Sequence, residues 1–154
     1  MIRIALYQPD IPQNTGTILR LAACLRLEAH IIEPAGFDVS DRNFRRSGMD
    51  YLDQVSIVRH PDWNAFESWR HDAGARLALL TTQGATPFIS FTFRDGDVLM
   101  FGRESAGVPD IVHKAADARL LIPMRPGLRS LNVAMAAAIA AAEALRQTNG
   151  FDAG

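Results

Sequence analysis

Six short apolar segments, alternating with stretches of helical spacing, constrain how this chain can fold more than any other feature. They lie at residues 2–7, 29–32, 55–58, 77–80, 97–101 and 120–122. Continuous apolar strands separated by helices are typical of a parallel sheet that is covered on both faces. The sequence therefore predicts an α/β fold, with a mostly parallel sheet flanked by helices. A single domain is expected over residues 1–154, with a frayed tail from about residue 149.

Apolar spacing and residues that cap helix starts indicate where the helices lie. Helices are expected over about residues 14–27, 42–46 and 131–147, and another is expected to carry Trp63, Phe66 and Trp69. Side chains that favour the N-cap precede them: Asn14 or Thr15, Ser40 or Asp41, Asp62, and Ser130. Capping does not explain Asn132 as readily, because Asn is a poor helix former. The apolar neighbours of Cys24 predict a buried, reduced thiol.

Composition excludes several classes of protein. The net charge is −1, so the chain is not a bulk polycation, and 48% apolar residues exclude disorder over most of its length. A single cysteine excludes an internal disulfide and a cysteine-based zinc site, and the four histidines have no metal-binding spacing. No metal is expected. The chain opens without a secretory signal and its longest apolar run, 133–142, is too short for a bilayer, so a cytoplasmic protein without membrane contact is expected.

The basic residues are almost all arginine, because Lys114 is the only lysine among sixteen. Genomic base composition is one explanation of this bias. Bidentate recognition of phosphate, which Arg performs better than Lys, is the functional alternative.

Three loops carry the candidate chemistry, because ligands of open parallel sheets lie beyond the carboxyl ends of the strands. The first is 14–17, where side chains and free amides at a helix start favour an anion. This loop is similar to the phosphate loop of a flavodoxin-like protein, but a simple capped helix explains it equally well. Arg20 lies one turn further on, on the side of Gly16 and Thr17, where it would face such an anion.

The second loop is 102–107, in which two glycines bracket Glu104. Glycine lets a backbone approach a ligand closely and adopt positive φ. The third loop, 122–132, brings Ser130 and Asn132 to the start of the last helix. The fingerprint Gly-x-Gly-x-x-Gly is missing after the first strand, which argues against an ordinary Rossmann dehydrogenase or methyltransferase.

Together the loops form an ordered series of motifs. They read Asn14-x-Gly16-x-x-x-Arg20, then Leu99-x-x-Gly102-x-Glu104-x-x-Gly107, then Ile122-Pro123-Met124 followed by Ser130-Leu131-Asn132. This series resembles the three motifs of the SPOUT superfamily of RNA ribose 2′-O-methyltransferases, in its TrmH-like family. Segments 30–37 and 45–51 are similar to the TrmL type, which methylates the wobble ribose, position 34, of certain leucine tRNAs.

The resemblance implies more than the residues show by themselves. It implies a deep trefoil knot in the C-terminal part, S-adenosylmethionine as cofactor, and a homodimer formed by the first and last helices. The implied reaction is 2′-O-methylation of cytidine or modified uridine at position 34, in the anticodon stem-loop of tRNA, with leucine isoacceptors as substrates.

The resemblance also assigns roles to residues. The implied cofactor-binding residues are Leu80, Gly102, Gly107, Ile122, Met124, Ser130 and Leu131. Arg20 is the implied central catalytic residue, and we expect it to grip a phosphate and orient the hydroxyl, because a guanidinium holds its proton far above neutral pH. The polar frame around it would be Asn14, Glu104, Ser130 and Asn132. Expected phosphate contacts of the RNA are Arg42, Arg45, Arg46, Arg125 and Arg129.

Three alternatives stay open at this point. The same chemistry could act on another ribose of tRNA or ribosomal RNA. Residues 14–17 are also compatible with a flavodoxin-like flavin carrier, which would leave the second and third loops unexplained. The third alternative is an RNA-binding protein that kept the fold and lost catalysis, against which the presence of Arg20, Glu104 and Asn132 speaks.

Overall fold

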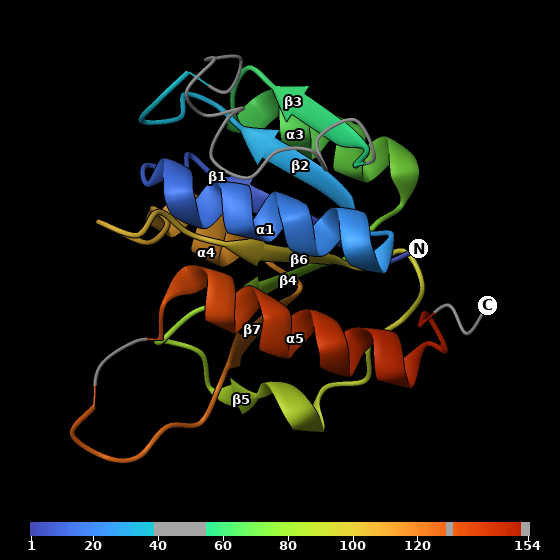
Figure 1. Ribbon diagram of the computed structural model, residues 1–154, viewed down its shortest axis with the longest axis vertical. Coiled ribbons are helices and arrows are strands. Elements are labelled where there is room, and N and C mark those ends of the chain that lie inside the picture. The colour runs from blue at the N-terminus through green and yellow to red at the C-terminus, as the bar shows by residue number, and fades with distance from the viewer. Residues whose placement is uncertain (39–54, 129–130, 152–154) are drawn as a thin grey trace.

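The computed structural model describes residues 1–38, 55–128 and 131–151. Within these residues, seven parallel strands form one sheet in the order β3-β2-β1-β6-β4-β7-β5 (Figure 1). In chain order the strands are β1 (Arg3–Tyr7), β2 (Glu28–Ile32), β3 (Ile57–His60), β4 (Leu77–Leu80), β5 (Thr86–Pro87), β6 (Val98–Phe101) and β7 (Ala118–Leu121). The predicted parallel sheet is confirmed.

Helices cover both faces of this sheet. They are α1 (Pro12–Leu25), α3 (Trp63–Ala73), α4 (Asp110–Ala115) and α5 (Val133–Gln147), and a 3₁₀ turn η2 (Phe88–Ser90) follows β5. Figure 1 shows α1 and α5 side by side on one face and α3 and α4 on the other. Residues of β1 alternate between the two cores, because Ile4 and Leu6 pack with α1 and α5 whereas Ala5 and Tyr7 pack toward α3 and α4.

Alanines let α5 approach the sheet and α1 closely. Ala137, Ala140, Ala141 and Ala144 of α5 are fully buried against Ile18 and Leu19 of α1 and the strands. The apolar run 133–142 therefore belongs to a covering helix whose alanines face the core, whereas Met135 and Ile139 are exposed. No helix among the described residues is long and apolar enough to span a membrane.

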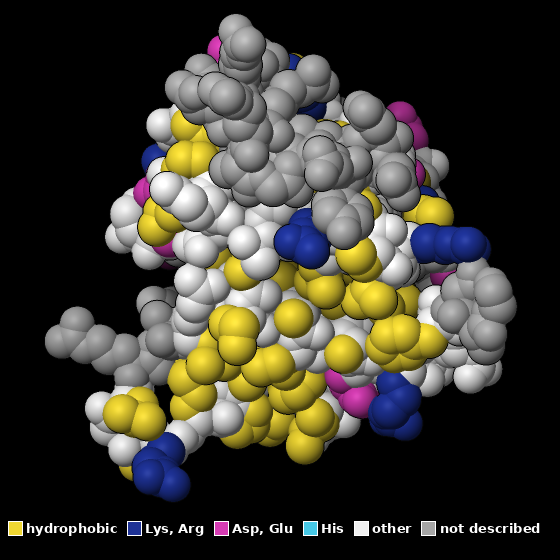
Figure 2. Space-filling view, viewed as in Figure 1, with side chains coloured by type: hydrophobic (Ala, Val, Ile, Leu, Met, Phe, Trp, Pro, Cys, Tyr) yellow, Lys and Arg dark blue, Asp and Glu magenta, His cyan; other side chains and the backbone are white. Residues whose placement is uncertain are grey.

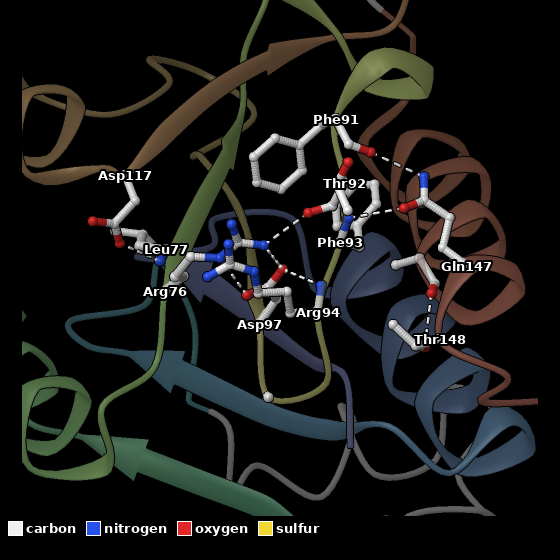
Figure 3. A network of polar contacts seen from close by, with 12 residues as sticks. Arg76, Leu77, Phe91, Thr92, Phe93, Arg94, Asp97, Asp117, Gln147 and Thr148 are labelled. Carbon is white, nitrogen blue, oxygen red and sulfur yellow. Dashed lines mark hydrogen bonds and ion pairs between the residues drawn. The ribbon is translucent and has the colours of Figure 1, made fainter.

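A polar network fastens the end of α5 to the segment that precedes β6 (Figure 3). The backbone N–H of Phe93 donates to Gln147 Oε1 at 2.8 Å, and Gln147 Nε2 donates to the carbonyl of Phe91 at 3.0 Å. On the other side of this segment, Arg76 forms an ion pair of 2.6 Å with the buried Asp97. The network therefore links the start of β4, segment 91–97 and the last turn of α5.

Both site-bearing helices begin at other residues than predicted. The first starts at Pro12, with Ile11 as an N-cap that makes no side-chain hydrogen bond. Proline has the φ of a first helical residue, so neither Asn14 nor Thr15 is the cap. The last helix starts at Val133, and its N-cap is Asn132 instead of Ser130. Asp62 caps α3 as predicted, by accepting from the N–H of Ala65 at 2.8 Å.

Some elements escaped the sequence pattern altogether. Strand β5, turn η2 and helix α4 are too short to show a period. Cys24 is exposed on α1, so the prediction of a buried thiol was wrong. The helix expected over 42–46 lies outside the described residues.

Candidate functional site

A cavity of about 940 Å³ lies at the carboxyl ends of β4, β6 and β7. Its walls are the segments 79–82, 101–108 and 121–128, together with the starts of α1 and α5. Sites for small molecules and cofactors typically measure about 300–1,000 Å³ and are lined by apolar side chains with a few polar groups. The cavity has the size and the position of such a site.

Most of the predicted site residues line this one cavity. Those predicted for the cofactor are Leu80, Gly102, Gly107, Ile122, Met124 and Leu131. Those predicted for the catalytic frame are Asn14, Glu104 and Asn132. Arg125, expected to contact RNA, is exposed and lies on the same wall. Three segments that are far apart in the sequence therefore meet at one place.

Other predicted residues lie elsewhere. Arg20 is exposed on α1, further along the helix than Asn14, and is not part of the described cavity wall. Ser130, Arg129, Arg42, Arg45 and Arg46 lie outside the described residues.

The proposed phosphate loop at 14–17 is wrong, because these residues form the first turns of α1 and Thr15 and Gly16 are buried. The structural basis for a flavodoxin-like interpretation is therefore lost.

The loop between Gly102 and Gly107 folds back on itself. Arg103 N–H donates to the carbonyl of Gly107 at 3.0 Å, and Gly107 N–H donates to the carbonyl of Arg103 at 2.8 Å. A Cβ on Gly102 would lie only 2.7 Å from the carbonyl carbon of Gly107, and Gly107 has a φ of +65°. The loop therefore favours glycine at both positions, at 102 because a Cβ would collide and at 107 because φ is positive. The close approach at Gly102 is to its own loop and not to a ligand.

Two asparagines join the starts of α1 and α5 at the cavity. Asn132 Nδ2 donates to Asn14 Oδ1 at 3.0 Å. The Oδ1 atom of Asn132 accepts from the N–H groups of Ala134 and Met135, at 2.8 and 3.3 Å. Asn132 thus caps α5 and orients Asn14 with the same side chain.

Glu104 is held by Asp10, which lies between β1 and α1. The N–H of Asp10 donates to Glu104 Oε2 at 3.2 Å, and the N–H of Glu104 donates to Asp10 Oδ1 at 3.2 Å. Burial raises the pKa of Glu104, and the neighbouring Asp10 carboxylate raises it further. Hydrogen bonds with Glu104 and Ser105 lower the pKa of Asp10 to about 2. Asp10 is therefore the ionised member of this pair and Glu104 the member that binds a proton more readily.

Sequence reasoning missed several residues of the site. Thr81 and Thr82 line the cavity directly after β4. Asp10 follows β1 and is hydrogen-bonded to Glu104 from outside the described cavity wall. Their position after parallel strands was the available signal, since ligands gather at that edge. Among the described residues, no group of three or more His, Cys, Asp or Glu could hold a metal ion.

A model of the family described as SpoU rRNA Methylase matches residues 1–142. The chain belongs to this family. Its relatives include a protein of Beijerinckia indica that is 64% identical over 144 residues, covering 94% of this chain and 90% of the relative. That relative is named tRNA (cytidine(34)-2′-O)-methyltransferase.

Solved structures of other proteins share the fold. One, described as giving structural insights into the 2-OH methylation of C/U34 on tRNA, has a TM-score of 0.91, 41% identity, and coverage of 97% of both chains. Another is the SpoU methyltransferase AviRb of Streptomyces viridochromogenes in complex with the cofactor AdoMet. It has a TM-score of 0.85 and 29% identity, and the match covers 96% of this chain and 57% of that chain.

Methyltransferases of this family use S-adenosylmethionine (AdoMet). The lining of the cavity at the carboxyl ends of β4, β6 and β7 fits that molecule. Leu80, Ile122 and Leu131 offer apolar surface for an adenine, and the surrounding loops offer backbone groups for its polar edge. A Cβ added at Gly107 would meet no described atom within 4 Å, so the space beside this glycine is open to a ligand.

Proposed function

We propose that this chain transfers a methyl group from S-adenosylmethionine to the ribose 2′-oxygen at position 34 of tRNA, where the base is cytidine or modified uridine. The observation that carries the proposal is the convergence of Asn14, Glu104 and Asn132 with the loops after β4, β6 and β7 around one cavity. The name of the Beijerinckia relative and the subject of the C/U34 structure support this substrate.

The cofactor supplies an electrophilic methyl group on a sulfonium. The protein must hold the ribose hydroxyl in line with that methyl group and remove its proton, because a neutral hydroxyl is a poor nucleophile. In the proposed arrangement Leu80, Ile122 and Leu131 hold the cofactor. Asn14 and Asn132 present their side-chain amides to the cavity, and we assign Ser130 to the same polar frame. Glu104 is available to hold a proton.

We assign Arg20 to the RNA side of the site, where its guanidinium grips a phosphate next to the reacting ribose. Its exposed position on α1, beyond Asn14, supports this role. Lys carries the same charge without the planar fork that binds phosphate in a bidentate manner. Arg20→Lys is therefore expected to lower turnover strongly while the heat of AdoMet binding stays that of the wild type. Near-normal turnover would remove this role.

The substrate is tested by mass spectrometry of tRNA nucleosides from cells with and without the protein. We expect one ribose methyl at position 34 to be lost, in leucine isoacceptors first, and to return when the gene is restored. Loss of a methyl group from another tRNA ribose or from ribosomal RNA would assign the protein to that substrate instead.

The proposed reaction takes place in the cytoplasm, where the chain would meet tRNA.

We also propose that two copies pair through α1 and α5. Figure 2 shows hydrophobic side chains gathered over α5 on this face. Met135 and Ile139 of α5 are 59% and 38% exposed. A second copy would bury this patch. Ile139→Glu is expected to give monomers in sedimentation, whereas Ile111→Glu on the opposite face, where Ile111 is 62% exposed, should leave the assembly unchanged.

The proposed deep knot is supported by the position of segment 81–97 relative to the two ends of α5. Val133 and Ala136 share the cavity with Thr81 and Thr82, and Gln147 is bonded to Phe91 and Phe93. Segment 81–97 therefore lines the same cavity as the start of α5 and is hydrogen-bonded to the end of α5, as expected for a loop around a threaded helix.

A further inference from the structure

Asp10 makes more contacts with the loop 102–107 than its place in the sequence suggests. It stands 94 residues from Glu104, yet the two residues exchange reciprocal backbone-to-carboxylate hydrogen bonds of 3.2 Å. Ser105 Oγ donates to Asp10 Oδ2, and Arg103 Nε lies 3.6 Å from the same oxygen. One carboxylate thus contacts three consecutive residues of the loop.

The position of Asp10 is itself closely determined. Gly36 N–H donates to the carbonyl of Pro9 at 2.8 Å. A Cβ on Gly36 would lie 2.8 Å from Asp10 Cβ, so the backbone at Gly36 packs directly against Asp10. Asp10 can therefore act as a fixed support for the loop, because it is confined from the side of β2.

Glu104 lines the cavity, whereas Asp10 does not belong to its described wall. Asp10 can thus influence the chemistry only through the loop that it holds. Without this support, the carboxyl group of Glu104 would have to find its orientation among several rotamers. A misplacement of about 1 Å at a reacting group costs about 100-fold in rate.

We propose that Asp10 is a positioning residue of the methyl transfer, which fixes the carboxyl group of Glu104 at the rim of the cavity by binding the loop 103–105. The proposal rests on the proposed function, because it assigns Asp10 to the same site. The charge that faces this pair is that of Arg103, whose Nε lies 3.6 Å from Asp10 Oδ2. The pKa of Asp10, about 2, keeps it ionised. Burial raises the pKa of Glu104, and the hydrogen bond with Asp10 and the charge of Asp10 raise it further.

The decisive experiment is a double-mutant cycle with Asp10→Asn and Glu104→Gln. Asn keeps the shape of Asp and can still accept from the N–H of Glu104, but it lacks the charge. We expect Asp10→Asn to lower kcat about 10- to 100-fold at unchanged AdoMet affinity. In the Glu104→Gln background it should cause little further loss, because a residue that acts through another has no separate effect.

Asp72→Asn is the matched control, since Asp72 is exposed on α3, on the other face of the sheet. Wild-type kcat in Asp10→Asn, or losses that multiply in the double variant, would overturn the proposal. A parallel loss of AdoMet affinity and thermal stability would show that Asp10 only holds the fold. Ser105→Ala removes a single contact to Asp10 and is expected to give a smaller kcat effect of the same kind.

A second readout is independent of activity and of any ligand. Carbon NMR titration of the Glu104 carboxyl in the protein alone should show a lower pKa in Asp10→Asn than in the wild type. Hydrogen exchange of the amides at 103–107 should be faster in Asp10→Ala. An unchanged titration and unchanged exchange would refute the coupling. Failure of the proposed function would instead appear as wild-type protein that methylates no RNA while these two shifts persist.

Discussion

Asn132 donates from Nδ2 to Asn14 Oδ1 at 3.0 Å and thereby ties the start of α5 to the first turn of α1. The same side chain accepts from the N–H groups of Ala134 and Met135. A capping function and a positioning function thus coincide in one residue. They can be separated experimentally because each uses a different atom of the amide.

Asn132→Asp should separate these two functions. A carboxylate still accepts from the helix N–H groups, and its charge is favourable at a helix start. It cannot donate to Asn14, so the Asn14 amide would have to turn round and donate its own N–H, which reverses the polarity that Asn14 presents to the cavity. We expect wild-type or higher Tm, with kcat/KM lower by about fivefold, the equivalent of about 1 kcal/mol for one neutral hydrogen bond. Thermal melts and methyl-transfer assays measure the two effects.

Asn132→Ala and Asn14→Ala complete the comparison. The first loses the cap as well and should cost about 1 kcal/mol of unfolding free energy. The second should lower activity alone, while Gln13→Ala, exposed on the same turn of α1, should change neither. Full activity of Asn132→Asp would show that the contact with Asn14 has no catalytic importance.

The two glycines of the loop 102–107 should respond differently to substitution by alanine. A Cβ at position 102 would collide with the backbone of Gly107, at 2.7 to 3.0 Å, so the loop must move. We expect Gly102→Ala to reduce AdoMet binding, measured by calorimetry, and to destabilise the fold by about 1–3 kcal/mol.

Gly107 has open space around it but a φ of +65°. Gly107→Ala should therefore cost only the left-handed conformation, about 1–2 kcal/mol, and Gly107→Asn should recover part of that loss. Equal AdoMet affinity in Gly102→Ala and the wild type would contradict the steric argument.

Arg125 is exposed on the cavity wall and is expected to contact an RNA phosphate. Each phosphate contact releases counterions, so binding weakens as salt rises. Arg125→Ala should weaken tRNA binding and reduce the slope of log Kd against log salt by about 0.7–0.9. Titrations at several salt concentrations measure this slope. Arg94→Ala, which removes an exposed charge before β6, is the control, and an unchanged slope in Arg125→Ala would exclude the contact.

The sheet and the position of the site were predictable because both depend on local patterns. Continuous apolar runs such as 77–80 gave parallel strands, and the pair Gly102 and Gly107 marked a tight loop at a strand end. The start of α1 was misplaced because the φ preference of Pro12 decided it and not a capping side chain. The contact of Asp10 with Glu104 was out of reach, because it depends on how β1 and β6 bring distant loops together.

Two buried histidines give the stability of the protein an acid-sensitive component. His30 and His60 are 0% and 5% exposed, and their ring nitrogens lie 2.8 Å apart. His30 Nε2 lies 2.7 Å from Glu28 Oε1, and Trp69 packs on the His30 ring at 4.2 Å between centroids. Burial lowers the pKa of both histidines, and the neighbouring His30 lowers that of His60 further.

The sign of the pH effect follows from these shifts. Below the ordinary pKa of 6.5 the unfolded chain binds protons that the folded chain does not, so unfolding becomes easier as pH falls toward the folded pKa values. Each histidine contributes a slope of up to about 1.4 kcal/mol per pH unit in that window. Urea unfolding at several pH values should show this loss, and His60→Gln should reduce its slope. His71→Gln, a change at an exposed site on α3, should leave the slope unchanged. An equal slope in His60→Gln and the wild type would show that His30 and His60 are not the source of the pH dependence.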